Sequence, residues 1–432
     1  MTVLITTIPH VPGYFNAAYN MAIFQVSAYL RKNYPEIDVV ARDCAALNCT
    51  WKDVANLIHK QDYELIAILG DYDSVDSLER LLYYIKELSP KSKTLIFGRL
   101  PMQIPEFFEK YGIDFIAHSG DFEINALSAL RYLQYGDEPS GTLYKIGQIY
   151  REGSPAKLLS PESFVFPDPS EVPYDAYYNL YKDDNQRYCG IPNRKELVVH
   201  VSRGCPIGCE FCDVQLLQGR MDRRVSPRSV VDYLEENKDN FEYASFFSAI
   251  FTLKKRWIEE FCKLMIAHGV PMPWKCVTTT FSLKQCDLAM LREAGCVRIG
   301  LGIETLEDKP SEILPKHKLI ERRDLDYLLK ECRKNDIEIN AFLMCGIKDE
   351  TKEGLESTIN YIESLGARAR LSLYTPYETL NPDMTLSQVS QLNRQTYTED
   401  SLFDSQHKQF TYDLLYKRRY RESKVQNNVP VK

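Results

Sequence analysis

Residues 203–212 read RGCPIGCEFC, and the interpretation of the whole chain starts from this stretch. It places Cys205, Cys209 and Cys212 in a CxxxCxxC spacing, directly after the apolar run 197–201. Three thiolates on one tight loop at a strand end can hold three irons of a cubane cluster and leave the fourth iron open for a ligand that is not protein. The stretch therefore predicts an iron–sulfur reaction site.

A structural zinc site is the main alternative for clustered cysteines. Zinc takes four closed ligands, commonly from two separated CxxC or CxxH pairs. Here His200 lies on the preceding predicted strand and Asp213 is a harder ligand, so no fourth partner stands close to the cysteine triplet. The remaining cysteines are scattered singly and are interpreted as small buried hydrophobic residues.

The residues that follow the cysteine loop alternate between strand and helix patterns. Ser226 as N-cap and Pro227 at the first helical position predict the start of the next helix. Six β/α units over residues 195–375 predict a partial parallel barrel, in which chemistry lies at the carboxyl ends of the strands. The predicted strands are 197–201, 243–247, 274–278, 297–302, 338–344 and 368–373.

The first 140 residues also alternate, which predicts an open, mostly parallel α/β sheet of the Rossmann type. Ligands bind such sheets beyond the carboxyl ends of the strands, where this chain carries Gly70, Gly98 and Gly120. A glycine there would let a ligand approach the backbone closely. The predicted strands are 3–7, 38–41, 65–69, 94–97 and 114–117.

Two further segments complete the predicted order of the α/β chain. Residues 141–194 are rich in proline and lose periodicity, so they are predicted to be an extended linker between two domains. Residues 376–432 are predicted to be a short C-terminal helical extension that caps the barrel and ends in a basic tail.

Composition limits the functional class. The 432 residues are 44% hydrophobic and 26% charged, enough for two or more domain cores. A formal net charge of −7 gives no basic field for nucleic acid, so a small-molecule substrate is the expected partner. The N-terminus enters an apolar strand without a signal sequence, and no apolar run reaches the roughly 18 residues of a membrane span. We therefore expect a cytoplasmic protein without a membrane partner.

With Phe211 just before the last cysteine, the CxxxCxxC loop on a six-unit partial barrel resembles the radical S-adenosylmethionine (SAM) superfamily. The resemblance implies a [4Fe–4S] cluster on Cys205, Cys209 and Cys212 whose open iron binds SAM. It also implies an electron donor such as flavodoxin or ferredoxin, because the reduced cluster cleaves SAM to a 5′-deoxyadenosyl radical. The residues that match SAM-contacting positions of the family are Phe211, Gly302, Glu304 and Gly346.

The second barrel strand departs from the family pattern. Relatives commonly carry an acidic pair before a Phe-Thr-Leu segment, whereas this chain reads FSAIFTL over residues 247–253. Ser248 stands where an acid would hold the SAM ammonium group. A hydroxyl can accept that hydrogen bond but lacks its charge assistance.

The order of Rossmann-like domain, linker and barrel is similar to the cobalamin-binding subgroup of the superfamily. Gly70, Gly98, Arg99, Gly120 and Asp121 match the strand-end loops that surround the corrin in relatives. Arg99 replaces a usual glycine and would crowd cobalamin or pair with one of its amide or phosphate groups. The chain has no DxHxxG sequence, which excludes only the mode in which histidine binds cobalt.

The resemblance implies a cobalamin-dependent methyltransferase that acts on a small molecule or natural-product intermediate. The alternatives are a radical dehydratase or deoxygenase, an epimerase or a cyclase with a vestigial cobalamin domain, and a non-catalytic iron–sulfur sensor. Tyr374 and Tyr377 match positions that face substrate in relatives and are the candidate catalytic residues, with burial against the C-terminal segment as the alternative. Methylthiotransferases fit poorly, since the chain lacks a second cysteine triplet.

Overall fold

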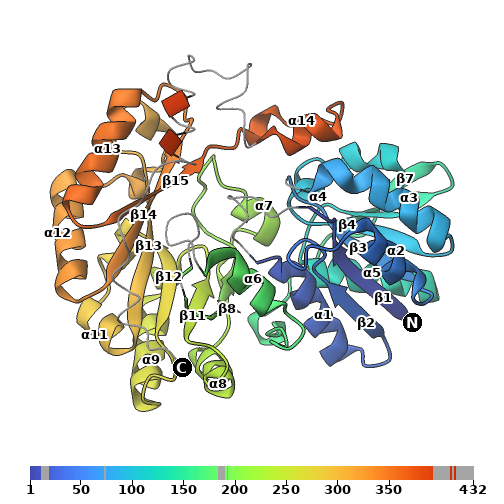
Figure 1. Ribbon diagram of the computed structural model, residues 1–432, viewed down its shortest axis with the longest axis horizontal. Coiled ribbons are helices and arrows are strands. Elements are labelled where there is room, and N and C mark those ends of the chain that lie inside the picture. The colour runs from blue at the N-terminus through green and yellow to red at the C-terminus, as the bar shows by residue number, and fades with distance from the viewer. Residues whose placement is uncertain are drawn as a thin grey trace. The chain divides into compact units, whose positions relative to one another are not determined.

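The computed structural model describes residues 1–10, 19–72, 74–182, 190–191, 193–392, 409–410 and 413–414. These residues form two compact units (Figure 1). Unit 1 comprises Met1–Tyr177, Asp213–Gly219 and Pro376–Leu392, and unit 2 is built mainly from Tyr178–Cys212 and Arg220–Thr375.

Unit 1 contains a seven-stranded sheet in the order β2-β1-β3-β4-β5-β6-β7. Strands β1 to β5 are parallel, which confirms the predicted open Rossmann-like sheet. The helices α1 and α5 pack together, and so do α2 and α3, as expected for a sheet covered on both faces (Figure 1). The strands are β1 (Thr2–Thr7), β2 (Asp38–Arg42), β3 (Leu65–Leu69), β4 (Lys93–Phe97), β5 (Phe115–Ala117), β6 (Thr142–Ile146) and β7 (Ile149–Glu152), and the helices are α1 (Met21–Asn33), α2 (Trp51–His59), α3 (Leu78–Leu88), α4 (Arg99–Gln103), α5 (Phe122–Tyr135), α7 (Val214–Gln218) and α14 (Leu386–Ser390).

The segment predicted as an extended linker contains regular structure. Its first residues form the hairpin β6–β7, which adds two antiparallel strands to the edge of the sheet. Gly147, with a φ of 64°, lies in the connection between them, where a left-handed backbone favours glycine. Further on, helix α6 (Tyr174–Tyr181) begins with buried tyrosines, and the Tyr177 hydroxyl donates to Asp43. The prolines therefore interrupt, but do not exclude, secondary structure here.

The prediction that the C-terminal segment caps the barrel is wrong for residues 376–392, which belong to unit 1. Leu386, Val389 and Leu392 are buried in the same hydrophobic core as Leu4 and Ile66 of the unit 1 sheet. The apolar face of α14 thus packs against the hydrophobic core of unit 1. The basic tail after residue 414 lies outside the described residues.

Replacing the fully buried Leu392 by alanine is expected to lower the stability of unit 1 by about 2–5 kcal/mol, because it leaves a cavity in that core. Hydrogen exchange should then accelerate in peptides from β3 and not in peptides from β13 of unit 2. The neighbouring exposed Gln391, changed to alanine, is the matched control. Acceleration confined to β13 would contradict this packing.

Unit 2 contains a six-stranded, all-parallel sheet in the order β15-β14-β13-β12-β11-β8, which confirms the partial barrel. Ser226 caps the helix after the cysteine loop as predicted, since its hydroxyl accepts from Ser229 N–H at 3.1 Å. The strands are β8 (Glu196–His200), β11 (Tyr243–Phe247), β12 (Trp274–Thr279), β13 (Cys296–Glu304), β14 (Glu338–Cys345) and β15 (Arg368–Leu373), and the helices are α8 (Pro227–Asn237), α9 (Lys255–Ala267), α10 (Thr280–Leu283), α11 (Leu288–Glu293), α12 (Arg322–Lys334) and α13 (Lys352–Ser364).

None of the helices in the described part of the chain combines the length and the apolar character that a membrane crossing requires.

Candidate active site

The cysteine loop belongs to unit 2, where it follows the carboxyl end of β8 and is closed by a short antiparallel ribbon. Strand β9 (Ser202–Arg203) pairs with β10 (Arg223–Arg224), so residues 204–222 form an excursion with a fixed base. Gly204, with a φ of 84°, turns the chain directly after β9. The ribbon therefore fixes both ends of the loop that carries the three cysteines.

The three cysteines differ in exposure. Cys205 is buried, Cys209 is partly buried and Cys212 is exposed. Burial raises the pKa of Cys205 and raises that of Cys209 to about 11, while the positive charge of Lys318 opposes both shifts. In the described chain, no three histidine, cysteine, aspartate or glutamate side chains are grouped to hold a single metal ion. A cubane instead spreads its thiolates over three irons, and the donor set of this loop suits that arrangement.

Glu304 lies at the end of β13, where the strand register shifts after Gly302. Such a bulge re-aims a side chain, and Glu304 has the uncommon φ of 67°. Its carboxylate forms an ion pair with Lys318, and both side chains are largely buried. A Cβ added at Gly302 would lie 2.7 Å from Glu304 Oε1, so glycine at 302 leaves room for this pair.

Lys318 is a residue that the sequence analysis missed. It ends the 3₁₀ turn η7 (Lys316–Lys318), and its Nζ lies 5.3 Å from the centre of the Phe211 ring. The structure thus brings together Phe211 and Glu304, two predicted SAM-contacting residues, around one cation. No sequence spacing connects Lys318 to Glu304, because they meet only through the fold.

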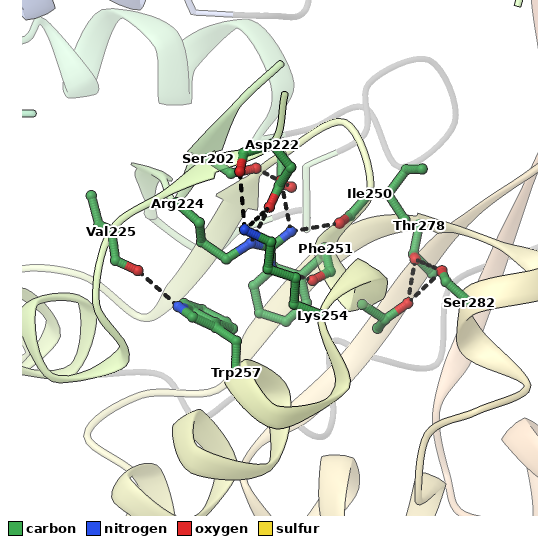
Figure 2. A network of polar contacts seen from close by, with 12 residues as sticks. Ser202, Asp222, Arg224, Val225, Ile250, Phe251, Lys254, Trp257, Thr278 and Ser282 are labelled. Carbon is green, nitrogen blue, oxygen red and sulfur yellow. Dashed lines mark hydrogen bonds and ion pairs between the residues drawn. The ribbon is translucent and has the colours of Figure 1, made fainter. Parts of the chain in front are cut away.

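Ser248 follows β11, and its hydroxyl lies 2.6 Å from that of Ser202 at the base of the cysteine loop. Figure 2 shows the polar network that holds this region together. The Arg224 guanidinium donates to the carbonyls of Ile250 and Phe251 at 2.9 and 2.6 Å and to the Asp222 carboxylate at 3.0 and 3.1 Å. Arg224 therefore ties the ribbon to the loop that carries Ser248, a second contribution that sequence spacing did not reveal.

His200 ends β8 and stacks on Phe247, with ring centres 5.2 Å apart. Burial, assisted by the charge of Arg203, lowers the pKa of His200 to about 3, so the imidazole is neutral. Its Nε2 is buried and makes no hydrogen bond in the described structure. The sequence analysis weighed His200 only as a possible zinc ligand. In the structure it is a neutral ring at the end of the strand that precedes the cysteine loop.

The remaining predicted residues of this half of the chain are placed as follows. Gly346 has a φ of 90°, and its N–H donates to Glu350 at 3.2 Å. Tyr374 lies in unit 2 and packs with Phe211 against Met344 and its neighbours. Tyr377 instead belongs to unit 1, where its ring centre is 6.2 Å from that of Tyr72. The two candidate catalytic tyrosines thus belong to different compact units.

At the carboxyl edge of the unit 1 sheet, the space beside the predicted glycines is occupied by the chain itself. A Cβ at Gly98 would lie 2.7 Å from Gly70 O, and one at Gly120 would lie 2.8 Å from Ala156 Cβ. These glycines permit close backbone packing at this edge, and the predicted approach of a ligand to them stays a prediction. The buried Asp121 accepts from Leu159 N–H at 2.7 Å and so fixes the following segment.

Arg99 is held by two carboxylates of unit 1. Its Nε lies 3.1 Å from Asp213 Oδ2 and 3.9 Å from Asp71 Oδ1. Burial raises the pKa of the Asp213 carboxyl, and the Arg99 charge opposes that shift. The Arg99 and Asp71 side chains remain 40% and 31% exposed, so this edge still presents polar groups to a ligand.

The sequence of the chain is similar to those of known proteins. It is 25% identical over 349 residues to an uncharacterized methyltransferase of Pyrococcus horikoshii, covering 79% of this chain and 73% of that protein. It is 31% identical over 188 residues to the anaerobic magnesium-protoporphyrin IX monomethyl ester cyclase of Cereibacter sphaeroides, covering 42% and 30% respectively.

Among solved structures, the fold matches the radical SAM methyltransferase TsrM of Kitasatospora setae, solved with tryptophan and a SAM analogue. The TM-score is 0.69 at 14% identity, covering 86% of this chain and 72% of that one. The model of the Radical SAM superfamily matches residues 199–362, which include both the cysteine loop and the strand that ends at Glu304. Residues 199–362, which carry the cysteine loop, are therefore similar to the Radical SAM superfamily.

Proposed function

We propose that the protein is a cobalamin-dependent radical SAM methyltransferase that acts on a small molecule or natural-product intermediate. The observation that carries the proposal is the three-cysteine loop, fixed by the β9–β10 ribbon at the carboxyl end of β8, in a chain that also has a Rossmann-like unit. The methyltransferase name of the Pyrococcus relative supports it, and so does the similar fold of TsrM, which has also been solved with cobalamin and a [4Fe–4S] cluster bound.

Each cofactor has candidate residues. The cluster would be held by Cys205, Cys209 and Cys212. SAM would contact Phe211, Ser248, Gly302, Glu304 and Gly346, and cobalamin would lie at the edge that carries Gly70, Gly98, Arg99, Gly120 and Asp121. When bound, the cluster and SAM supply a hydrogen-abstracting radical, and cobalamin supplies the methyl group.

The chain's own residues would bind and orient these groups. Glu304 would accept a hydrogen bond from SAM while Lys318 holds its carboxylate in place. Tyr374, on the unit that carries the cluster loop, would face the substrate, and Tyr377 would act through Asp213, which belongs to the same unit 1. An electron donor such as flavodoxin or ferredoxin would reduce the cluster in the cytoplasm. Nucleic acid would not be a partner of the protein.

The test is anaerobic reconstitution with iron, sulfide and hydroxocobalamin, followed by desalting, a visible spectrum and a cobalt assay. We expect close to one cobalt per chain together with a cluster that cleaves SAM on reduction. A control variant with all three loop cysteines replaced by alanine should retain cobalt and lose SAM cleavage. A wild-type cluster that cleaves SAM while the protein retains no cobalt would contradict the methyltransferase proposal.

A radical cyclase is the second candidate, because the 31% identity to the Cereibacter cyclase is the higher of the two identities, though over a shorter stretch. SAM cleavage without cobalt retention would favour it. Absence of any cluster-dependent SAM cleavage would instead favour a non-catalytic iron–sulfur protein.

A further inference from the structure

The buried ion pair between Lys318 and Glu304 is the starting point. The two side chains keep only 11% and 10% of their surface exposed. They come from separate elements, since Glu304 ends β13 and Lys318 ends η7. The nearby Gly302 leaves the space that the pair occupies, because a Cβ there would lie 3.2 Å from Lys318 Nζ.

Folding stability alone gives little reason for such a pair. Removing two charges from water costs about as much as their attraction returns, and apolar replacements are often neutral or stabilising. Lys316, in the same turn, keeps its side chain exposed to solvent. Burial of Lys318 is therefore specific to its position and points to a role at the site.

The charge of Lys318 also reaches the cysteine loop. Its Nζ lies over the ring of Phe211, the residue before Cys212. One cation thus contacts the candidate SAM-contacting carboxylate and lies over the ring of the residue that precedes the last candidate cluster ligand.

We propose that Lys318 is a positioning residue that holds the Glu304 carboxylate for SAM and supplies a fixed positive charge that favours reduction of the cluster. The net charge around an iron–sulfur cluster is one of the factors that set its reduction potential, and a nearby cation stabilises the added electron. The proposal rests on the proposed function only in its iron–sulfur part. It requires neither cobalamin nor a particular substrate.

The test compares Lys318→Gln with Lys316→Gln in reconstituted holoenzyme. Both remove one positive charge from the same turn, but only the first removes the buried one. An EPR-monitored redox titration without SAM should show a lower cluster midpoint potential in Lys318→Gln and a wild-type potential in Lys316→Gln. The SAM concentration that half-saturates 5′-deoxyadenosine formation should rise about 10-fold or more in Lys318→Gln.

Glu304→Gln separates the two roles of Lys318. This variant keeps the cation, so its midpoint potential should equal or exceed that of the wild type, while its SAM half-saturation should rise. Adding Lys318→Gln should then lower the potential without a further 10-fold loss for SAM, because the carboxylate that Lys318 positions is already gone. The single variant Lys318→Arg keeps the positive charge, so its midpoint potential should equal that of the wild type.

Two outcomes would overturn the proposal. One is an unchanged potential and SAM half-saturation in Lys318→Gln; the other is a lowered potential in Glu304→Gln, which retains the cation. Both readouts are made without cobalamin or substrate. A wild-type enzyme that fails to retain cobalt or to transfer a methyl group would count against the proposed function and leave the Lys318 measurements interpretable.

Discussion

Replacing Cys212 by alanine is expected to abolish SAM cleavage and to remove most of the iron that the reconstituted protein retains. Each cysteine thiolate binds one iron of the cubane, and the fourth iron has no protein ligand. Without Cys212 the loop binds only two irons. Because Cys212 is exposed, the substitution should leave folding intact. Iron content, the visible absorption of the cluster and 5′-deoxyadenosine formation measure the effect.

Cys286→Ala is the matched control for this experiment. Cys286 is a partly buried thiol of unit 2 outside the CxxxCxxC loop, and burial raises its pKa to about 11. Its removal should preserve both iron and activity. Equal iron loss in the two variants, or full SAM cleavage by Cys212→Ala, would show that the loop is not the cluster site.

Replacing Arg224 by methionine is expected to destabilise unit 2 by about 3–5 kcal/mol. The Arg224 and Asp222 side chains are 1% and 4% exposed. The substitution removes the buried partner of the Asp222 carboxylate, which keeps only the half-exposed Lys254, and it removes the Arg224 donor from the carbonyls of Ile250 and Phe251. Adding Asp222→Asn should recover part of the loss, because it removes a buried charge that only the half-exposed Lys254 still offsets. Urea unfolding in a Trp51→Phe background measures the effect, since Trp257 and Trp274 both lie in unit 2.

The control for this second prediction is Arg228→Met. Arg228 pairs with Asp232 on the adjoining helix α8, but both side chains are more than half exposed. Solvent screens such a pair, so the change should stay within about 0.5 kcal/mol. Similar losses for both variants would mean that the Arg224 network does not fix the base of the cysteine loop.

The parallel strands of both sheets were predictable from the sequence to within one or two residues. Strands β3, β11 and β15 have the predicted bounds. In β3, which reads LIAIL, the reason is that a strand buried on both faces is a continuous apolar run. The hairpin β6–β7 was not predicted, since these short antiparallel strands are only partly buried and stand beside a proline-rich segment. Helix α6 was missed for a similar reason.

The site divides in the same way. The cysteine loop, Phe211, Glu304 and Gly302 could be named from local spacing, because each belongs to a short motif at a strand end. Lys318 and Arg224 could not, since each meets its partner only after strands and turns have packed. Tyr377 belongs to unit 1 because the C-terminal segment packs there. No periodic pattern in the sequence predicts that packing.

The sequence by itself determined the two α/β sheets and the cysteine loop at the end of β8, because periodicity, strand ends and CxxxCxxC spacing are local properties. Only the tertiary structure decided that Lys318 neutralises Glu304, that Arg224 braces the loop with Ser248 and that residues 376–392 pack on the unit 1 core. Those outcomes depend on which distant side chains share a desolvated space, where an unpaired charge is costly and an apolar face needs a partner.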